Sequence, residues 1–582
     1  MAMHSLRTNA LFATLLTLTC CGTLNAQTWN GSTGNWSVDS NWAGGFAPIS
    51  SASTILTFSG NTSYTATNDF VVAFELNQLN FTGDGTGNAL GKNIIDGNRL
   101  RFAGTSAQIH VSNMFSPMLE IQSDIDFASN TEIIPTKKGL FLSGALSGSA
   151  DITVNGGGTG VLALTGYTPS TFSGHVTISS GHLAIESDVR LGYANVTLAN
   201  QSTIEFQQPM ATSRTYILTG DYNTIYTDSE VTMVGQLTGS SDIHKEGYGT
   251  LILRNTQNDF SGVIQISSGT LKLGSSDALP QNSGITLSAN SVFDTDGYSP
   301  SIKTLNGGSP SGMGYINNSG TSMTVGTGTN VGDKVGFLQA PIYGRGALIK
   351  NGDGFFELAA ESTYSGGTII NQGTVIVSNS SGTATGSGDV SLATLATLAG
   401  DGRIMGKVTG SGTISPSRST SSLIGKLSLD GGLNLNTGTG GKYIWNLGQL
   451  SESNPGIDFD QISIAGGDLT LGGSSKLTLE FVDSGVDPNS TDPFWDSPHI
   501  WTIIDVNNSE TNFFNNTFSE ITNPTYSTGS FTLLDPADFS GDIVLSFTPN
   551  PVPEPAFILT ATILGAIGGQ VLRKRSKGKN RD

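Results

Sequence analysis

Two pairs of aspartates have the residue type and spacing that acid–base chemistry on a β-strand requires. Asp458 and Asp460 are two residues apart, as are Asp294 and Asp296. Side chains two apart on a strand point to the same face, so each pair would bring two carboxylates together. Enzymes that cleave polysaccharides use paired carboxylates, but they need further acidic and basic groups beside them. We therefore interpret both pairs as solvated strand edges and assign no catalytic residue.

Histidine is the other side chain that could bind a metal or transfer protons. After residue 26 the histidines are His110, His175, His182, His244 and His499. They show neither the i, i+4 spacing of a helical zinc site nor a His-x-His pair with carboxylates nearby. We expect surface imidazoles at His175 and His182, and we assign no metal or cofactor. Acidic loops would suit calcium, but no set of residues identifies a calcium site.

Three tryptophans near the start of the chain could bind sugars. Trp29, Trp36 and Trp42 lie within Gln27–Gly60, and aromatic faces suit the apolar faces of sugar rings. A glycan site would require the three rings to be exposed and roughly coplanar. The favoured interpretation is a Trp-rich N-terminal cap over residues 27–60.

The composition indicates an ordered, turn-rich β-protein. The chain has 582 residues, of which 76 are Gly, and only 13% are charged, about half the usual share. Its net charge of -19 argues against nucleic acid as a partner, because phosphate binding needs clustered Lys and Arg. The two cysteines, Cys20 and Cys21, lie close to the N-terminus in the expected leader. We therefore expect no disulfide bond in the exported protein.

Three segments share one repeated pattern. They are residues 160–185, 249–273 and 354–377, with the aromatic residues Phe172, Phe260 and Tyr364. Counted from the aromatic residue, each copy has Gly at +2 and +9. Positions +4, +6, +11 and +13 are apolar except for Thr368. Each copy is therefore predicted to form strand, loop, strand, turn and strand, with the +9 glycine in the turn.

Such a unit cannot bury its apolar face alone, so neighbouring units must stack. We predict an all-β fold: a right-handed parallel β-helix, or β-solenoid, over residues 61–441. Residues 27–60 and 442–550 are predicted as β-rich caps, the second containing Trp445, Trp495 and Trp501. A string of β-sandwiches is the alternative, because short alternating strands fit either architecture.

The third copy carries a family resemblance. Tyr364-Ser365-Gly366-Gly367-Thr368 followed by Gly373-Thr374-Val375 resembles the autotransporter-associated β-strand repeat. In the first two copies His175 and Val263 replace the second glycine of this motif. The resemblance implies a solenoid like the surface-exposed passenger of an autotransporter.

The first 26 residues have the parts of a secretory signal peptide. A start with one Arg is followed by an apolar run and a small-residue exit, and we place the cleavage after Ala26. The signal would be helical. A lipoprotein signal through Cys20 or Cys21 is the alternative, although the preceding residues suit it poorly.

Residues 551–582 have a three-part pattern. Val552, Pro553, Glu554 and Pro555 precede the apolar segment 556–572, which is followed by the basic residues Arg573, Lys574 and Arg575. As a helix the apolar segment would be about 25 Å long, just enough to cross a bilayer. The basic cluster would stay on the cytoplasmic side. The simplest interpretation is a C-terminal transmembrane anchor.

This tripartite end resembles the PEP-CTERM sorting signal of Gram-negative bacteria. The resemblance implies that an exosortase-like enzyme recognises the segment and cuts near Pro553 and Pro555. The precursor would be anchored in the inner membrane, and the product would reach the cell surface or an extracellular polysaccharide matrix.

Together these features predict an exported, non-enzymatic surface or matrix protein with a structural or adhesive function. The alternatives are a polysaccharide-active β-helix enzyme, either a lyase or a hydrolase, and a glycan-binding surface protein. An enzyme would show a groove with converging carboxylates and a base, whereas a scaffold would present sides covered by Ser, Thr and Asn.

Overall fold

The computed structural model describes residues 26–551, with gaps at 60–62, 83–90, 113–117, 136–138, 282, 310–311, 313, 419–422, 508–515 and 523. The predicted signal peptide, apart from Ala26, lies outside the described residues. So do the predicted sorting motif Val552–Pro555, the apolar segment 556–572 and the basic cluster that follows it. Within the described part of the chain, no helix has the length and apolar character needed to cross a membrane.

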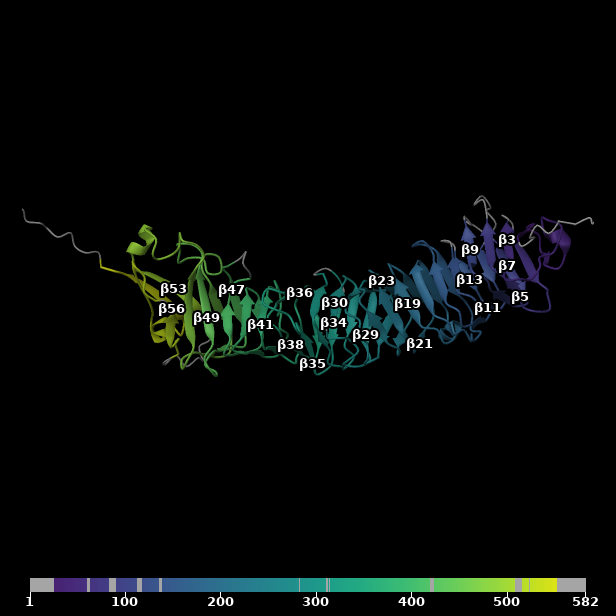
Figure 1. Ribbon diagram of the computed structural model, residues 1–582. Helices are drawn as coiled ribbons and strands as arrows, with labels where there is room; N and C mark the ends of the chain where they lie inside the picture. Colours follow the sequence, from purple (N-terminus) through teal and green to yellow (C-terminus); the bar gives the residue numbers. More distant parts are fainter. Residues whose placement is uncertain are drawn as a thin grey trace, which may run out of the picture.

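The chain winds into one elongated solenoid (Figure 1). The described residues form 56 strands and four short 3-10 helices, η1 (Asp39–Asn41), η2 (Asp188–Leu191), η3 (Pro493–Asp496) and η4 (Pro536–Phe539). Pairings between strands are parallel except for two antiparallel pairings near the C-terminal end. The all-β prediction and the parallel stacking are therefore confirmed, and the β-sandwich alternative is wrong.

The longest sheet has 21 strands and runs from the first coil to the last. In order, its strands are β2 (Gly34–Asn35), β4 (Tyr64–Asn68), β7 (Lys92–Gly97), β10 (Met118–Ile121), β13 (Leu140–Leu142), β16 (Val161–Leu164), β18 (His182–Ile185), β20 (Thr203–Phe206), β23 (Asn223–Thr227), β26 (Ile243–Glu246), β28 (Val263–Ile266), β30 (Gly284–Leu287), β33 (Thr304–Gly307), β36 (Lys334–Leu338), β39 (Phe355–Leu358), β41 (Gly373–Val377), β43 (Ala396–Gly400), β46 (Thr413–Ser415), β49 (Lys442–Leu447), β52 (Lys476–Phe481) and β54 (Glu520–Thr522).

Five shorter sheets form the other sides of the solenoid. The ten-stranded sheet contains β1 (Ala26–Trp29), β3 (Ile55–Ser59), β6 (Gln78–Thr82), β9 (Ala107–Ser112), β12 (Thr131–Ile134), β15 (Ile152–Asn155), β17 (Val176–Ser180), β19 (Val196–Ala199), β22 (Tyr216–Thr219) and β25 (Leu237–Gly239). The four-stranded sheet contains β5 (Phe74–Leu76), β8 (Leu100–Phe102), β11 (Ile125–Phe127) and β14 (Leu146–Gly148). The seven-stranded sheet contains β21 (Met210–Thr212), β24 (Val231–Met233), β27 (Thr250–Leu253), β29 (Gly269–Leu273), β31 (Ser291–Asp294), β34 (Tyr315–Asn318) and β37 (Ile342–Gly344).

The last two sheets lie toward the C-terminal half. The eight-stranded sheet contains β32 (Ser301–Ile302), β35 (Ser322–Val325), β38 (Ala347–Lys350), β40 (Thr368–Ile370), β42 (Val390–Leu392), β45 (Val408–Gly410), β48 (Leu433–Asn434) and β51 (Leu469–Thr470). The six-stranded sheet contains β44 (Arg403–Ile404), β47 (Lys426–Leu429), β50 (Gln461–Ile464), β53 (His499–Val506), β56 (Ile543–Pro549) and β55 (Gly529–Leu533).

The core runs along the axis of the solenoid. Alternate residues of the strands point inward, and the buried apolar side chains form a single cluster that reaches from Trp29 to Phe547. Equivalent inward rings stack from one coil to the next, as Phe58 does on Phe81 with ring centroids 5.5 Å apart. Burial in this structure therefore depends on the neighbouring coil, as expected for a repeat protein.

The N-terminal tryptophans close the first coil. Trp29, Trp36 and Trp42 are 0–2% exposed, and the rings of Trp29 and Trp42 meet edge to face at 82°. The backbone N–H of Ala43 donates to the carbonyl of Thr28, so this segment covers the outer edge of β1. Buried rings at right angles cannot form a flat platform for sugars, and that interpretation is wrong.

The solenoid continues beyond residue 441, where sequence composition indicated a separate cap. Strand β46 pairs in parallel with β49, and β49 pairs in parallel with β52. The regular winding ends only where β53, β56 and β55 form antiparallel pairs. Trp445, Trp495 and Trp501 are buried in this last section.

Candidate functional site

The three sequence repeats form the predicted strand–loop–strand–turn–strand units. The first copy supplies β16, β17 and β18, the second β27, β28 and β29, and the third β39, β40 and β41. The side chains at positions +4, +6, +11 and +13 are buried in every copy; they are Val176, Ile178, Leu183, Ile185, Ile264, Ile266, Leu271, Leu273, Thr368, Ile370, Val375 and Val377. The period of two in the sequence thus predicted the inward face of each strand correctly.

The two glycines of each copy have different physical roles. The +9 glycines Gly181, Gly269 and Gly373 have φ values of 98°, 67° and 72°, which confirms the predicted left-handed turn. The +2 glycines have no such φ value. At Gly262 an added Cβ atom would lie 2.2 Å from the carbonyl oxygen of Ser241 in the preceding coil. The +2 position therefore needs glycine because two coils approach closely there.

Thr368, the polar exception at position +4, has a buried partner. Its Oγ1 lies 2.6 Å from the hydroxyl of Tyr364, and both residues are fully buried. The other copies have Phe172 with Val176 and Phe260 with Ile264 at these positions. The third copy therefore replaces an apolar pair by a hydrogen-bonded pair.

We expect Tyr364→Phe and Thr368→Val each to destabilise the protein by about 1–2 kcal/mol, because each leaves a buried hydroxyl without its partner. The double variant recreates the apolar pair of the first copy. Its loss of unfolding free energy should be smaller than the sum of the losses in the two single variants. A double-mutant cycle of unfolding free energies checks this. Strictly additive losses would show that the hydrogen bond contributes nothing.

Two buried lysines hydrogen-bond to turns of two successive coils. The Nζ of Lys245 donates to the carbonyls of Glu246, Gly247 and Ser268, at 2.9, 2.7 and 3.2 Å. Lys350 makes the same three contacts in the third copy, to the carbonyls of Asn351, Gly352 and Gln372 at 2.8, 2.8 and 3.2 Å. The first copy has Val154 in this place. The shared Lys-x-Gly-x-Gly spacing was visible in the sequence but was not used.

Burial lowers the pKa of both Lys245 and Lys350 to about 8. The unfolded chain keeps its lysine protons up to about pH 10.4. Between these values the unfolded state holds more protons, so stability should rise with pH, by at most about 1.4 kcal/mol per pH unit for each lysine. Unfolding free energies measured at pH 7.5 and 10 should show the rise, and Lys245→Met combined with Lys350→Met should remove it. An equal rise in the double variant would contradict this assignment.

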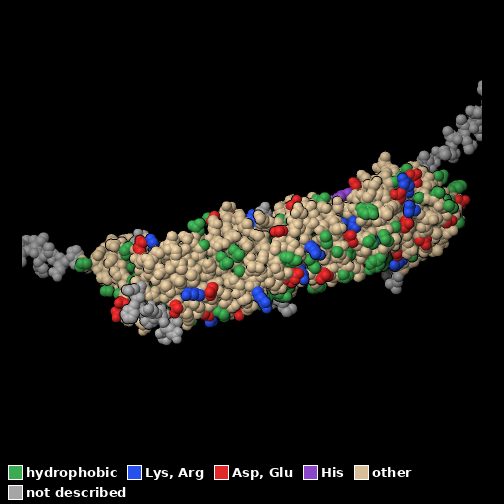
Figure 2. Space-filling view, turned by 90° about the horizontal axis from the view of Figure 1, so that it is seen from below, with side chains coloured by type: hydrophobic (Ala, Val, Ile, Leu, Met, Phe, Trp, Pro, Cys, Tyr) green, Lys and Arg blue, Asp and Glu red, His purple; other side chains and the backbone are tan. Residues whose placement is uncertain are grey.

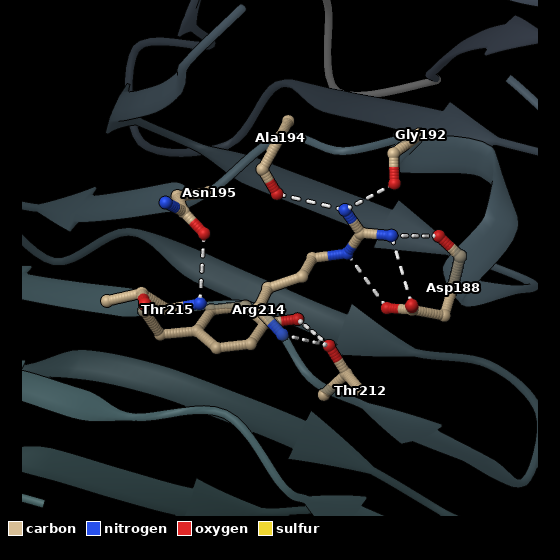
Figure 3. A network of polar contacts seen from close by, with 8 residues as sticks. Asp188, Gly192, Ala194, Asn195, Thr212, Arg214 and Thr215 are labelled. Carbon is tan, nitrogen blue, oxygen red and sulfur yellow. Dashed lines mark hydrogen bonds and ion pairs between the residues drawn. The ribbon is translucent and has the colours of Figure 1, made fainter. Parts of the chain in front are cut away.

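Two arginines hydrogen-bond to the backbone of neighbouring coils at a different place along the solenoid. Arg214 donates to the carbonyls of Gly192 and Ala194, both at 2.9 Å, and its Nε lies 2.8 Å from the Asp188 carboxylate (Figure 3). Arg190 is fully buried and donates to the carbonyls of Thr168, Leu142 and Gly144 at 2.9, 3.0 and 2.6 Å. Both guanidinium groups thus donate to several backbone carbonyls, which lie in loops except for that of Leu142 at the end of β13.

The prediction for Asp458 and Asp460 is wrong, because these side chains are not at a solvated edge. Asp458 is 8% exposed and Asp460 is 0% exposed. The Asp460 carboxyl accepts hydrogen bonds from the Gly425 N–H at 2.8 Å and from the Asn446 N–H and Nδ2 at 3.2 and 2.7 Å. Burial raises the pKa of Asp460 to about 7, although these donors act in the opposite direction. An enclosed carboxyl that accepts three hydrogen bonds from two residues joins segments of the chain and cannot reach a substrate.

The second aspartate pair lies on the surface, as predicted. Asp296 pairs with Lys272 at 3.1 Å, and Asp294 accepts from Asn317 Nδ2 at 2.9 Å. These contacts link neighbouring strands of the seven-stranded sheet. The pair therefore belongs to a surface network.

The two repeat histidines are partly exposed, His175 directly before β17 and His182 at the start of β18. His175 Nε2 lies 2.7 Å from Thr197 Oγ1, and His182 lies 2.7 Å from Glu205, whose pKa it lowers by hydrogen bonding. Among the residues that the structure describes, no group of three or more His, Cys, Asp or Glu side chains is arranged to hold a metal.

The face of the solenoid seen in Figure 2 consists mostly of uncharged polar side chains, glycine and backbone, with charged and apolar side chains scattered singly or in small groups. Ala26, the predicted cleavage site, is the exposed first residue of β1. The described residues therefore present an extended surface.

Comparison with known proteins identifies the repeats. The family described as passenger-associated-transport-repeat matches residues 152–185, 243–273 and 348–377. Over an alignment of 221 residues, the chain is 31% identical to the adhesin BmaC autotransporter of Brucella suis biovar 1 (strain 1330). The match covers 35% of this chain and 6% of that much longer protein. The chain is thus a parallel β-solenoid that carries three passenger-associated-transport repeats.

Proposed function

We propose that this protein is exported to the cell surface or extracellular matrix and acts there without catalysis, in attachment or matrix organisation. The observation that carries the proposal is the unbroken stack from β2 to β54, in which each matched repeat supplies two neighbouring strands and further coils lie between the repeats. Such a rod places a long surface outside the cell without needing a catalytic pocket. The similarity to a protein named as an adhesin supports the adhesive part of the proposal.

The proposed route uses both ends of the chain. A signal peptide cut after Ala26 would start export. Val552, Pro553, Glu554 and Pro555, followed by the membrane segment 556–572 and the basic cluster Arg573, Lys574 and Arg575, would then be recognised by an exosortase-like enzyme. The precursor would be held in the inner membrane of a Gram-negative bacterium until it is processed. The processed protein would then lie among extracellular polysaccharide.

Attachment of cells to abiotic and polysaccharide-coated surfaces tests the proposed function. Cells that lack the protein should attach several-fold less than cells that carry it, and purified protein added in excess should reduce attachment of the wild type. Equal attachment in all three conditions, with the protein shown to be present at the wild-type surface, would contradict the adhesive function.

Cell fractionation tests the sorting route separately. Deletion of residues 552–555 should leave full-length protein in the inner membrane, whereas Asn550→Ala with Pro551→Ala, a change directly upstream, should leave processing intact. If wild type and deletion variant are both full-length in the inner membrane, the sorting signal is wrong.

A further inference from the structure

A groove of about 410 Å³ crosses one side of the solenoid near its middle. Its lining includes Gln339, Tyr343, Glu361, Thr363, Ser380 and Ser381. These residues come from three successive coils, in or beside β37, after β39 and after β41. Its volume lies within the range of about 300–1,000 Å³ that is typical of small-molecule sites.

One aromatic ring, that of Tyr343, lines this groove. Tyr343 in β37 is 40% exposed, and its ring lies 5.5 Å from that of Tyr315 in the neighbouring strand β34, at an angle of 59°. The pairing of β34 with β37 fixes the spacing of the two rings. An aromatic ring that is both held in place and exposed can pack against the C–H face of a sugar.

Three polar side chains of the groove are free to bind. Gln339, Glu361 and Thr363 make no side-chain hydrogen bond within the described part of the chain. Other polar residues nearby have partners within the protein: Asn371 donates to Asn351 at 2.8 Å, and Ser378 donates to Glu357 at 2.6 Å. The groove therefore gathers donors and acceptors that the protein itself does not satisfy.

The position of Glu361 is supported by a glycine. An added Cβ atom at Gly382 would lie 2.1 Å from Glu361 Cδ, so the carboxylate occupies the space that this glycine leaves. Glu361 is the charged residue of the lining, which contains neither Lys nor Arg. A carboxylate accepts hydrogen bonds from sugar hydroxyls but repels uronates and sulfates.

We infer that this groove binds a neutral polysaccharide chain, with Tyr343 packing against a sugar ring and Glu361, Gln339 and Thr363 bonding to its hydroxyls. This site is separate from the N-terminal tryptophans, which are buried. The inference deepens the proposed attachment function by naming the ligand class, but it is tested by binding rather than by cell attachment.

Titration of the purified exported protein with cellohexaose, maltohexaose, laminarihexaose and tri-galacturonate tests this site. We expect saturable binding of at least one neutral hexasaccharide and none of tri-galacturonate. Tyr343→Ala should weaken binding at least tenfold, and Glu361→Ala several-fold, while Tyr343→Phe should keep it within about twofold.

The matched control is Tyr248→Ala, which removes a tyrosine that is 88% exposed outside the groove and should leave binding unchanged. Failure of all three neutral hexasaccharides to bind, preferred binding of tri-galacturonate, or equal loss with Tyr248→Ala would overturn the inference. Because cell attachment is measured independently, failure at this groove leaves the proposed function standing.

Discussion

Gly262→Ala is expected to reduce the stability of the second repeat by about 3 kcal/mol, the upper end of the usual cost of overpacking. The added methyl group would lie 2.2 Å from the Ser241 carbonyl oxygen and 2.6 Å from its carbon. Backbone cannot move aside as a flexible side chain can, so the two coils must separate. Hydrogen exchange of the amides in β26 and β28 measures this local opening, and their protection should fall about 100-fold.

Gly157→Ala is the matched control. Unlike Gly262, Gly157 has a positive φ of 58°, but nothing lies within 4 Å of the place its Cβ atom would take. Gly157→Ala should lower the free energy of unfolding by only about 1 kcal/mol, which is the strain of an alanine in the left-handed backbone conformation. Equal effects of the two substitutions would contradict the close packing of coil on coil.

Asp460→Ala should destabilise the C-terminal coils by about 3 kcal/mol. The substitution leaves the Gly425 N–H and both Asn446 donors without an acceptor in a buried site, and each such group costs about 1–3 kcal/mol. The shift of the thermal or denaturant midpoint for this part of the chain measures the effect.

Asp458→Ala provides the comparison from the same strand region. Asp458 accepts one side-chain hydrogen bond, from Asn454 at 2.8 Å, so its removal should cost less than about 1 kcal/mol. If the two variants have the same stability, Asp460 is not the anchor that its contacts indicate.

The sequence predicted the features that local rules determine. The alternation around Ile178 and Leu183 placed both side chains inward, because a strand has a period of two. The +9 glycines were identified because a tight turn with positive φ favours glycine. Both rules operate within a few residues of the chain, and both were confirmed.

Features that depend on distant residues were not predicted. The burial of Asp460 depends on Gly425, 35 residues earlier, and an Asp-x-Asp pair resembles a solvated edge when that partner is unknown. The burial of Lys245 was not predicted, because a buried lysine needs carbonyl acceptors both from the adjacent turn and from Ser268 in the next coil. The groove at Tyr343 joins three coils, so no local pattern marks it.

The expected boundary at residue 441 illustrates the same difference. Trp445, Trp495 and Trp501 suggested a separate cap, because this stretch departs from the composition of the repeats. The backbone pairing from β46 to β49 nevertheless continues the ladder. Composition reports which side chains fill the core, whereas hydrogen-bond register decides whether one coil stacks on the next.

The central claim is that one continuous solenoid forms the body of this protein, since the proposed surface function depends on its extended shape. Small-angle X-ray scattering of residues 27–551 tests it most directly. The 21 strands of the longest sheet, at about 4.8 Å each, predict a rod about 100 Å long with a radius of gyration of about 30 Å or more. A compact particle with a radius of gyration near 25 Å, the value for a globule of this length, would contradict the account.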